Sequence, residues 1–310
     1  MRQTDLRKFH LATCFLITSL AGSAMAQQPG QKTFPSPQDA STALVAAAQA
    51  NDEKTTLEIL GPDGKQIISS GDPTEDDQSR TDFVRRYQEM HRLVREPGGL
   101  TLYVGAENWP LPIPLANKDG AWYFDTEAGT REILYRRIGR NEMSAIRVCQ
   151  ELTAAEKEFY AARHEYAQKI LSDEGQRNGL YWRAAPAGDE QMAEPQSPIG
   201  PLIASAVAEG YARSRDGGPT PYRGYYYRVL TGQGKNSPGG PRSYLAAAKM
   251  TGGFAFVAWP AEYRSSGVMT FIVNGDRVVY QKDLGRQTGA LAKAMKEYNP
   301  GPGWQKAEGE

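Results

Sequence analysis

This sequence contains little histidine or cysteine, and it has no surplus of positive or negative charge. The 310 residues include 3 His and 2 Cys, and 36 Lys and Arg balance 36 Asp and Glu. A zinc site needs three or four clustered ligands, whereas His91 and His164 stand far apart, so we expect no metal site. Neutralising nucleic-acid phosphates requires a concentrated basic surplus, so a nucleic-acid partner is not expected either.

The sequence also lacks an apolar segment long enough for a permanent membrane span. Its longest apolar stretch, Leu11 to Ala26, has about 16 residues, and a helix needs roughly 20 to cross a bilayer. Basic residues precede this stretch, and the small-residue triplet Ala24-Met25-Ala26 ends it, which is typical of a secretory signal peptide. We predict cleavage after Ala26, a periplasmic or secreted location, and no stable membrane span afterwards.

An internal disulfide is not expected in the mature chain. Cys14 leaves with the predicted signal peptide, so Cys149 remains alone. The chain must then rely on its core, and burial at this size reaches roughly three quarters of the unfolded surface. Cys149 lies in an apolar repeat, which favours a packed thiol over a nucleophile.

Motifs for catalysis or cofactor binding are missing as well. Neither Gly-x-Ser-x-Gly nor Ser-x-x-Lys occurs after residue 26. The glycines at 232–240 lack the spacing to Lys-Ser/Thr, or to a third glycine opening a helix, that a phosphate-binding loop requires. We therefore expect no cofactor, and an enzyme is less favoured than a binding protein.

The chain after the signal peptide divides into parts of different pattern. Residues 27–36 are predicted to be a flexible leader, and 37–125 an N-terminal α+β part with a helix opening at Pro37. The acidic stretch 71–77 suggests a loop, and 79–94 a helix. Strands follow to Phe124, with the alternating prolines of 110–114 at a sheet edge because they lack backbone donors.

Residues 126–310 are predicted to form a long helix and a C-terminal antiparallel sheet. No proline occurs from Thr126 to about Leu171, and apolar residues recur every seven positions, which indicates one helix. A connection at 186–198 and a short helix at 202–208 follow. Strands are expected at 222–230, 254–259, 268–273 and 278–280, with a hairpin at Asn274-Gly275 and a closing helix at 290–298. The fold class is therefore α+β, with the long central helix packed on antiparallel sheets.

A polar cluster on the predicted long helix is the first candidate site. Glu132, Arg136 and Arg140 fall four residues apart and share a face, where they favour an ion-pair network that docks the helix. The alternative is a polar pocket for an anionic or sugar-like ligand, with arginines as clamps. Its candidate residues are Asp125, Glu132, Arg136, Arg137, Arg140, Asn141 and Glu142. Glycoside cleavage by carboxylates such as Asp125 with Glu132 or Asp283 is a third hypothesis.

Four tryptophans form the second candidate site. Aromatic side chains on strands usually belong to a core, and the alternative is a surface on which a carbohydrate stacks. The residues are Trp109, Trp122, Trp182 and Trp259.

Several strings resemble exported bacterial proteins of domain-of-unknown-function family 2950. The first begins Asn108-Trp109-Pro110, and the match spans about residues 34–304. The matching strings lie at 108–115, 122–125, 136–142, 179–182, 224–226, 252–255, 258–260, 267–271 and 282–285. This resemblance implies no particular activity.

The C-terminal half also resembles, more weakly, the globular heads of pilin-like proteins, although about 100 residues and a cleavable signal precede the long helix here. The favoured hypothesis is a non-enzymatic binding or interaction module of the cell envelope, with an envelope protein or a glycan as partner. An envelope hydrolase acting on glycan or peptide, or a pilin-like assembly component, is the alternative.

Overall fold

The computed structural model describes residues 27–97, 99–173, 175–182, 197–200, 202, 206 and 220–308. The predicted signal peptide and most of the connection at 186–198 and of the short helix at 202–208 lie outside these residues. Within the described part of the chain, no helix combines the length and the apolar character that a membrane span requires.

Side-chain caps fix where the N-terminal helices begin. α1 (Pro37–Gln49) follows Ser36, whose hydroxyl accepts a hydrogen bond from the backbone of Asp39. Asp52 caps α2 (Glu53–Leu60) in the same way, and the short α3 (Lys65–Ile68) comes next. Phe34 and Gln31, from the segment predicted as a leader, are buried beside these helices.

The helix α4 (Pro73–Glu89) corrects two predictions. The acidic stretch 71–77 is not a loop, because Asp72 caps the helix and Pro73 and Glu75 lie in its first turn. Acidic residues and proline stabilise a helix N-terminus, where free amide groups carry partial positive charge. The helix also ends before residue 94, because His91–Glu96 forms strand β1.

The first sheet is antiparallel, with the order β1-β2-β4-β5 and with β3 paired to β2. Pro110 in β3 pairs with Tyr103, which confirms the predicted edge position of this proline. The remaining strands are β2 (Gly99–Val104), β3 (Trp109–Pro110), β4 (Leu115–Lys118) and β5 (Ala121–Phe124).

The long helix is confirmed as α5 (Thr126–Arg163), although it ends earlier than Leu171. His164 adopts a left-handed backbone with φ 58°, which stops the helix. The residues beyond it turn toward the short strand β12 (Lys249–Met250). The backbone amide of Tyr166 donates a hydrogen bond to the carbonyl of Met250 at 2.7 Å. The strand β6 (Lys169–Leu171) then pairs in parallel with β7 (Gly179–Tyr181).

The C-terminal sheet is antiparallel, in the order β17-β15-β14-β13-β8. Its strands are β8 (Tyr225–Leu230), β13 (Ala255–Pro260), β14 (Met269–Asn274), β15 (Tyr280–Asp283) and β17 (Gln305–Lys306). The predicted β14–β15 hairpin is present. Its left-handed residue is Arg277 with φ 62°, rather than Asn274 or Gly275, because the connection is longer than a two-residue turn.

The closing helix is shorter than the predicted 290–298. α7 (Thr288–Ala294) ends before β16 (Glu297–Tyr298), which pairs in parallel with β9 (Gly232–Gln233). Three short strands complete this end of the molecule: β10 (Arg242–Ser243), β11 (Leu245–Ala246) and β12 (Lys249–Met250).

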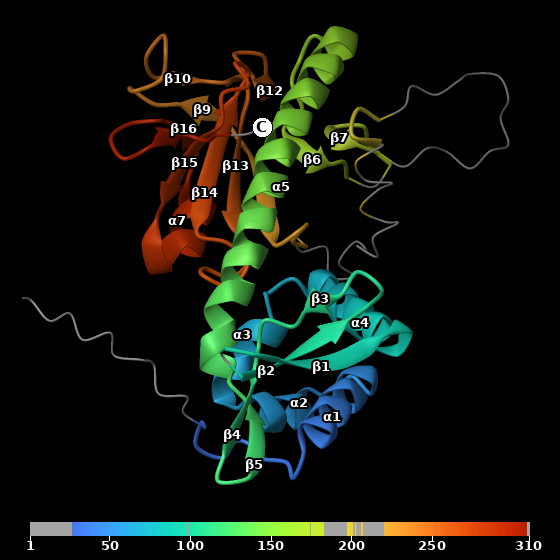
Figure 1. The fold of residues 1–310 in the computed structure, drawn as a ribbon. Coiled ribbons are helices and arrows are strands. Elements are labelled where there is room, and N and C mark those ends of the chain that lie inside the picture. Colours follow the sequence, from blue (N-terminus) through green and yellow to red (C-terminus); the bar gives the residue numbers. More distant parts are fainter. Residues whose placement is uncertain are drawn as a thin grey trace, which may run out of the picture.

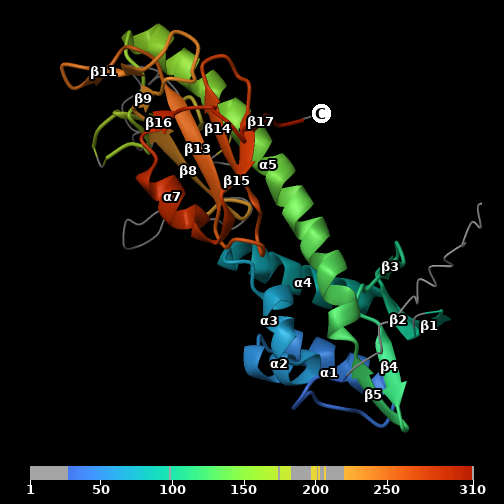
Figure 2. The same ribbon diagram turned by 90° about the vertical axis from the view of Figure 1, so that its left-hand side faces the viewer.

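Two hydrophobic cores lie along α5. The first is formed by the N-terminal helices and sheet, and the second by the sheet β8–β17 with the part of α5 that begins at Ala145. Figures 1 and 2 show α5 rising from the N-terminal part and then running beside the C-terminal sheet. The described structure therefore confirms the α+β class with a long helix packed on an antiparallel sheet.

Candidate functional site

A polar joint connects α4, α5 and the C-terminal sheet. We define it as Asp72, Glu75, Arg137, Arg140 and Asn141. One carboxylate oxygen of Glu75 accepts a hydrogen bond from Arg140 at 2.6 Å, and the other accepts one from Asn141 at 3.0 Å. Glu75 and Asn141 are almost fully buried. A buried carboxylate held by two partners in this way fixes the position of α4 against α5.

The C-terminal part is attached through the same groups. The amide of Asn141 also donates to the carbonyl of Ser266 at 3.1 Å. Asp72, the N-terminal cap of α4, also accepts a hydrogen bond from the backbone of Gly224 at 2.8 Å, through the carboxylate oxygen that does not cap the helix. The two cores are thus joined by buried hydrogen bonds between groups far apart in the chain.

Arg137 in the joint is bound to backbone carbonyls. Its guanidinium donates to Gln66 at 3.0 Å and to Ile67, both in α3. Burial lowers the pKa of Arg137 below its usual value, while the charges of Glu75 and Asp76 oppose that change. This side chain acts as a cationic cap on the C-terminal end of α3.

The remaining residues of the predicted polar pocket are spread along α5. Glu142 accepts hydrogen bonds from the backbones of Val268 and Met269 at 2.9 and 3.0 Å, and so ties α5 to β14. Glu132 and Arg136 form an exposed ion pair at 2.7 Å. Asp125 caps α5 at its start. The structure therefore brings together Arg137, Arg140 and Asn141 and leaves Asp125, Glu132 and Arg136 outside the joint.

The carboxylates of the glycosidase hypothesis lie on separate elements. Asp125 is a buried cap, Glu132 pairs with Arg136, and Asp283 on β15 accepts hydrogen bonds from Tyr263 and Gly285. That hypothesis stays a prediction.

The four tryptophans do not lie together. Trp109 and Trp122 pack against the first core, whereas Trp182 and Trp259 belong to the second. Arg163 and Arg177 lie over the ring of Trp182 at 5.7 and 5.9 Å from its centroid. Each tryptophan contributes to a core or its margin, as strand aromatics usually do.

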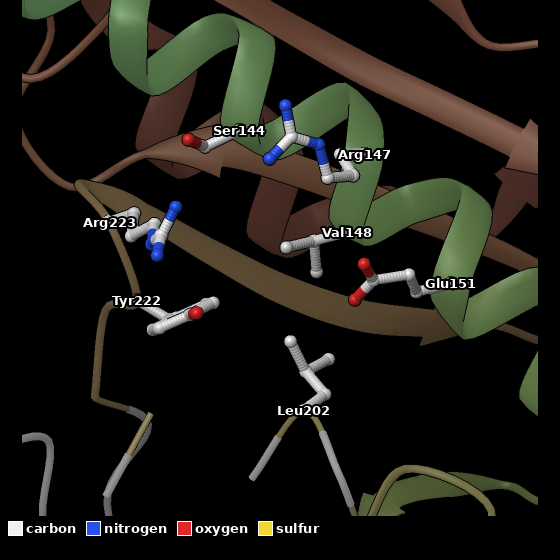
Figure 3. A pocket seen from close by; sticks show the side chains of 7 residues that line it. All are labelled: Ser144, Arg147, Val148, Glu151, Leu202, Tyr222 and Arg223. Carbon is white, nitrogen blue, oxygen red and sulfur yellow. The ribbon is translucent and has the colours of Figure 1, made fainter. Parts of the chain in front are cut away.

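A pocket of about 320 Å³ lies between α5 and the segment that precedes β8. Its volume is near the lower end of the range for small-ligand sites, roughly 300–1,000 Å³. Figure 3 shows two guanidinium groups toward one end and a carboxylate toward the other. Val148 lies between them, and Leu202 and Tyr222 lie on the facing side. The lining residues are Ser144, Arg147, Val148, Glu151, Leu202, Tyr222 and Arg223.

A tight turn holds Arg223 at this pocket. Tyr222 and Tyr225 exchange backbone hydrogen bonds at 2.8 and 3.1 Å, so Arg223 and Gly224 are the two central residues of the turn. Both have positive φ, 49° for Arg223 and 75° for Gly224, as a two-residue turn of this kind requires. A left-handed backbone is unfavourable for a residue with a side chain, so contacts around the turn must hold Arg223 in this conformation. The bond from Gly224 to Asp72 holds the turn in place.

Arg147 and Glu151 project from successive turns of α5 and line the same pocket. Residues four apart on a helix are close enough to pair, but no ion pair or hydrogen bond joins these two side chains to each other or to another described residue. Both are exposed. Elsewhere on α5, Arg136 and Arg140 do have carboxylate partners.

Sequence reasoning missed this pocket. Arg147 and Glu151 look like ordinary surface charges on a helix, and only the fold brings them opposite Arg223. Gly224 before an aromatic strand is the one local signal, because glycine readily adopts the positive φ of a tight turn.

The buried cysteine and the possible metal ligands also bear on which reactions the protein could catalyse. Cys149 is completely buried, and burial raises the pKa of its thiol to about 12, so the reactive thiolate is suppressed. Among the residues that the structure describes, no group of three His, Cys, Asp or Glu side chains could hold a metal ion.

Comparison with known proteins agrees with the resemblance seen in the sequence strings. No curated protein and no solved structure matches this chain. These comparisons give no support for the likeness to pilin heads. A family model described as "Protein of unknown function (DUF2950)" matches residues 31–307, which covers both cores, the polar joint and the pocket. The chain therefore belongs to the DUF2950 family of proteins of unknown function.

Proposed function

We propose that this protein is an exported, non-enzymatic binding module of the cell envelope, and that it holds a small anion between Arg147 and Arg223. The observation that carries the proposal is that two guanidinium groups from distant parts of the chain line one pocket. Guanidinium groups bind carboxylates and phosphates in a two-pronged geometry.

The charge distribution supports binding at this pocket in preference to the polar joint. In the joint, Arg137 donates to two carbonyls, and Arg140 and Asn141 share the carboxylate of Glu75. These groups already have protein partners. Arg147 is exposed and has no hydrogen bond or ion pair among the described residues, so it can receive a ligand without breaking a protein contact.

A thermal-shift experiment tests the anion site. Sodium acetate, sodium phosphate and N-acetylalanine are the probes. Each supplies an anion that has no positively charged group within the same molecule. At ten times its Kd, a probe stabilises the folded state by about 1.4 kcal/mol. This corresponds to roughly 3 °C in Tm at this chain length.

Arg147→Gln is expected to abolish the shift, whereas Arg131→Gln, an exposed arginine on the same helix outside the pocket, should retain it. No shift with any probe, or an equal shift in the Arg147→Gln variant, would exclude the proposed site.

The location is a separate part of the proposal. An apolar stretch with basic residues before it and the triplet Ala24-Met25-Ala26 at its end supports export with cleavage after Ala26. N-terminal sequencing of the protein recovered from an envelope fraction should therefore begin at Gln27. A chain that still begins at Met1 would rule out cleavage.

A further inference from the structure

We infer that the ligand of this pocket is a dipeptide with free amino and carboxyl termini, an inference that rests on the proposed anion site. The pocket has charges of both signs: Arg147 and Arg223 offer positive charge, and Glu151 offers negative charge. In Figure 3 Val148 lies between the carboxylate of Glu151 and the two guanidinium groups, and Leu202 lies on the facing wall of the pocket. A ligand that meets Arg147, the apolar side chains and Glu151 in turn has an anion, an apolar portion and a cation, in that order.

The backbone spacing of Arg147 and Glu151 on α5 is compatible with a ligand of dipeptide length. Arg147 and Glu151 are four residues apart on α5, which is about 6 Å along the axis of a helix. An extended dipeptide spans about 7 Å, whereas a single amino acid spans about half of that. A dipeptide therefore places its carboxylate at the arginines and its ammonium group at Glu151.

The order of the charges on the helix favours an external partner. An acid that precedes a base by four residues is the favourable arrangement for an intrahelical pair, and here the base precedes the acid. Glu132 and Arg136, in the favourable order, pair at 2.7 Å, whereas Arg85 and Glu89 on α4, in the same order as Arg147 and Glu151, pair more loosely at 3.7 Å. Arg147 and Glu151 thus gain little from pairing with each other and stay available for a ligand.

The apolar lining indicates the side chain that the ligand carries. Val148 is buried, Leu202 is half-buried and packs at the margin of the second core, and the ring of Tyr222 lies beside them. The guanidinium of Arg223 lies 5.5 Å from the centroid of that ring, which holds the charge above an apolar surface. An aliphatic side chain on the first residue of the dipeptide fits this wall.

Isothermal titration with three probes tests the inference: leucylalanine, its N-acetylated form and its C-terminal amide. The free dipeptide is expected to bind up to about fivefold more tightly than the acetylated form, because one ion pair open to solvent contributes up to about that much. Glu151→Gln should remove this difference and leave the affinity for the acetylated form unchanged. Arg147→Gln should weaken the binding of both, and the amide should bind weakly throughout.

Control variants, and outcomes that differ between the two hypotheses, distinguish failure of the dipeptide inference from failure of the anion site. Glu158→Gln and Arg131→Gln alter exposed charges of α5 outside the pocket and should behave as the unmodified protein. Equal binding of the free and acetylated forms, with loss of both in Arg147→Gln, overturns the dipeptide inference and supports the anion site. Absence of binding by all three peptides overturns the dipeptide inference, and the response to acetate and phosphate then decides the anion site.

Discussion

Glu156→Gln is expected to make the protein more stable than the unmodified chain at pH 8.5 and about equally stable at pH 5. Glu156 is completely buried on α5. One of its carboxyl oxygens accepts a hydrogen bond from the backbone of Ala167 at 2.9 Å, and the other has no partner. Burial raises the pKa of this carboxyl from 4.5 to about 8, against the opposing effect of the hydrogen bond from Ala167.

The direction of the pH dependence follows from proton binding. Below pH 4.5 the carboxyl is protonated in the folded and the unfolded chain alike. Between pH 4.5 and about 8 the unfolded chain loses the proton while the folded chain keeps it, so the free energy of unfolding falls as the pH rises. The loss is complete once the pH exceeds the folded pKa. A pKa change of this size corresponds to a few kcal/mol.

Urea denaturation between pH 5 and 8.5 measures this effect. The unmodified protein should lose stability across the range, and Glu156→Gln should lose less. The loss that remains in the variant includes that of Asp76, whose pKa burial also raises. The carboxyls of Asp52, Asp82, Glu96 and Asp173 have lowered pKa values, so they contribute below this range. Glu158→Gln, an exposed change on the same helix, should follow the unmodified protein. Parallel curves for all three proteins would mean that Glu156 is ionised in the folded state.

Asp72→Ala is expected to lower the free energy of unfolding by about 2–4 kcal/mol, which is the second large effect. Asp72 is 1% exposed, and its carboxylate accepts hydrogen bonds from the backbones of Thr74, Glu75 and Gly224. Loss of a helix cap costs about 1 kcal/mol, and a buried donor left without an acceptor costs about 1–3 kcal/mol. The substitution therefore weakens α4 and the attachment between the two cores together.

Chemical denaturation of Asp72→Ala and Ser36→Ala separates these contributions. Ser36 caps α1 through the backbone of Asp39 and takes no part in the polar joint, so its loss should cost about 1 kcal/mol. Equal losses for the two variants would show that the bond from Gly224 to Asp72 does not hold the cores together.

The sequence pattern predicted elements whose signals are local. An uninterrupted apolar repeat without proline located α5, and alternating prolines located an edge at Pro110, because both patterns act within a few residues. The end of α5 was misplaced because His164 adopts a left-handed backbone, a conformation that its neighbours in the sequence do not specify. The start of α4 was misplaced although Asp72-Pro73 is a recognisable helix start.

The candidate sites were harder to predict from the sequence than the helices and strands, because their residues meet partners that lie far away in the chain. The cluster on α5 was predicted with Glu132, Arg136 and Arg140 on one face, yet Arg140 pairs with Glu75, 65 residues away in the chain. Nothing near Arg140 in the sequence specifies that partner. The pocket depends in the same way on Arg223, which the fold brings opposite Arg147.

We propose that the charged side chains of α5 have two separate roles. Those near Asn141 hold the two cores together, and Arg147 and Glu151 bind a ligand. A crystal structure of the protein grown with leucylalanine tests this claim most directly. We expect the peptide carboxylate within hydrogen-bonding distance of Arg147 and Arg223, and its ammonium group beside Glu151. A peptide bound at Glu75 and Arg140, or at any site away from α5, would contradict it.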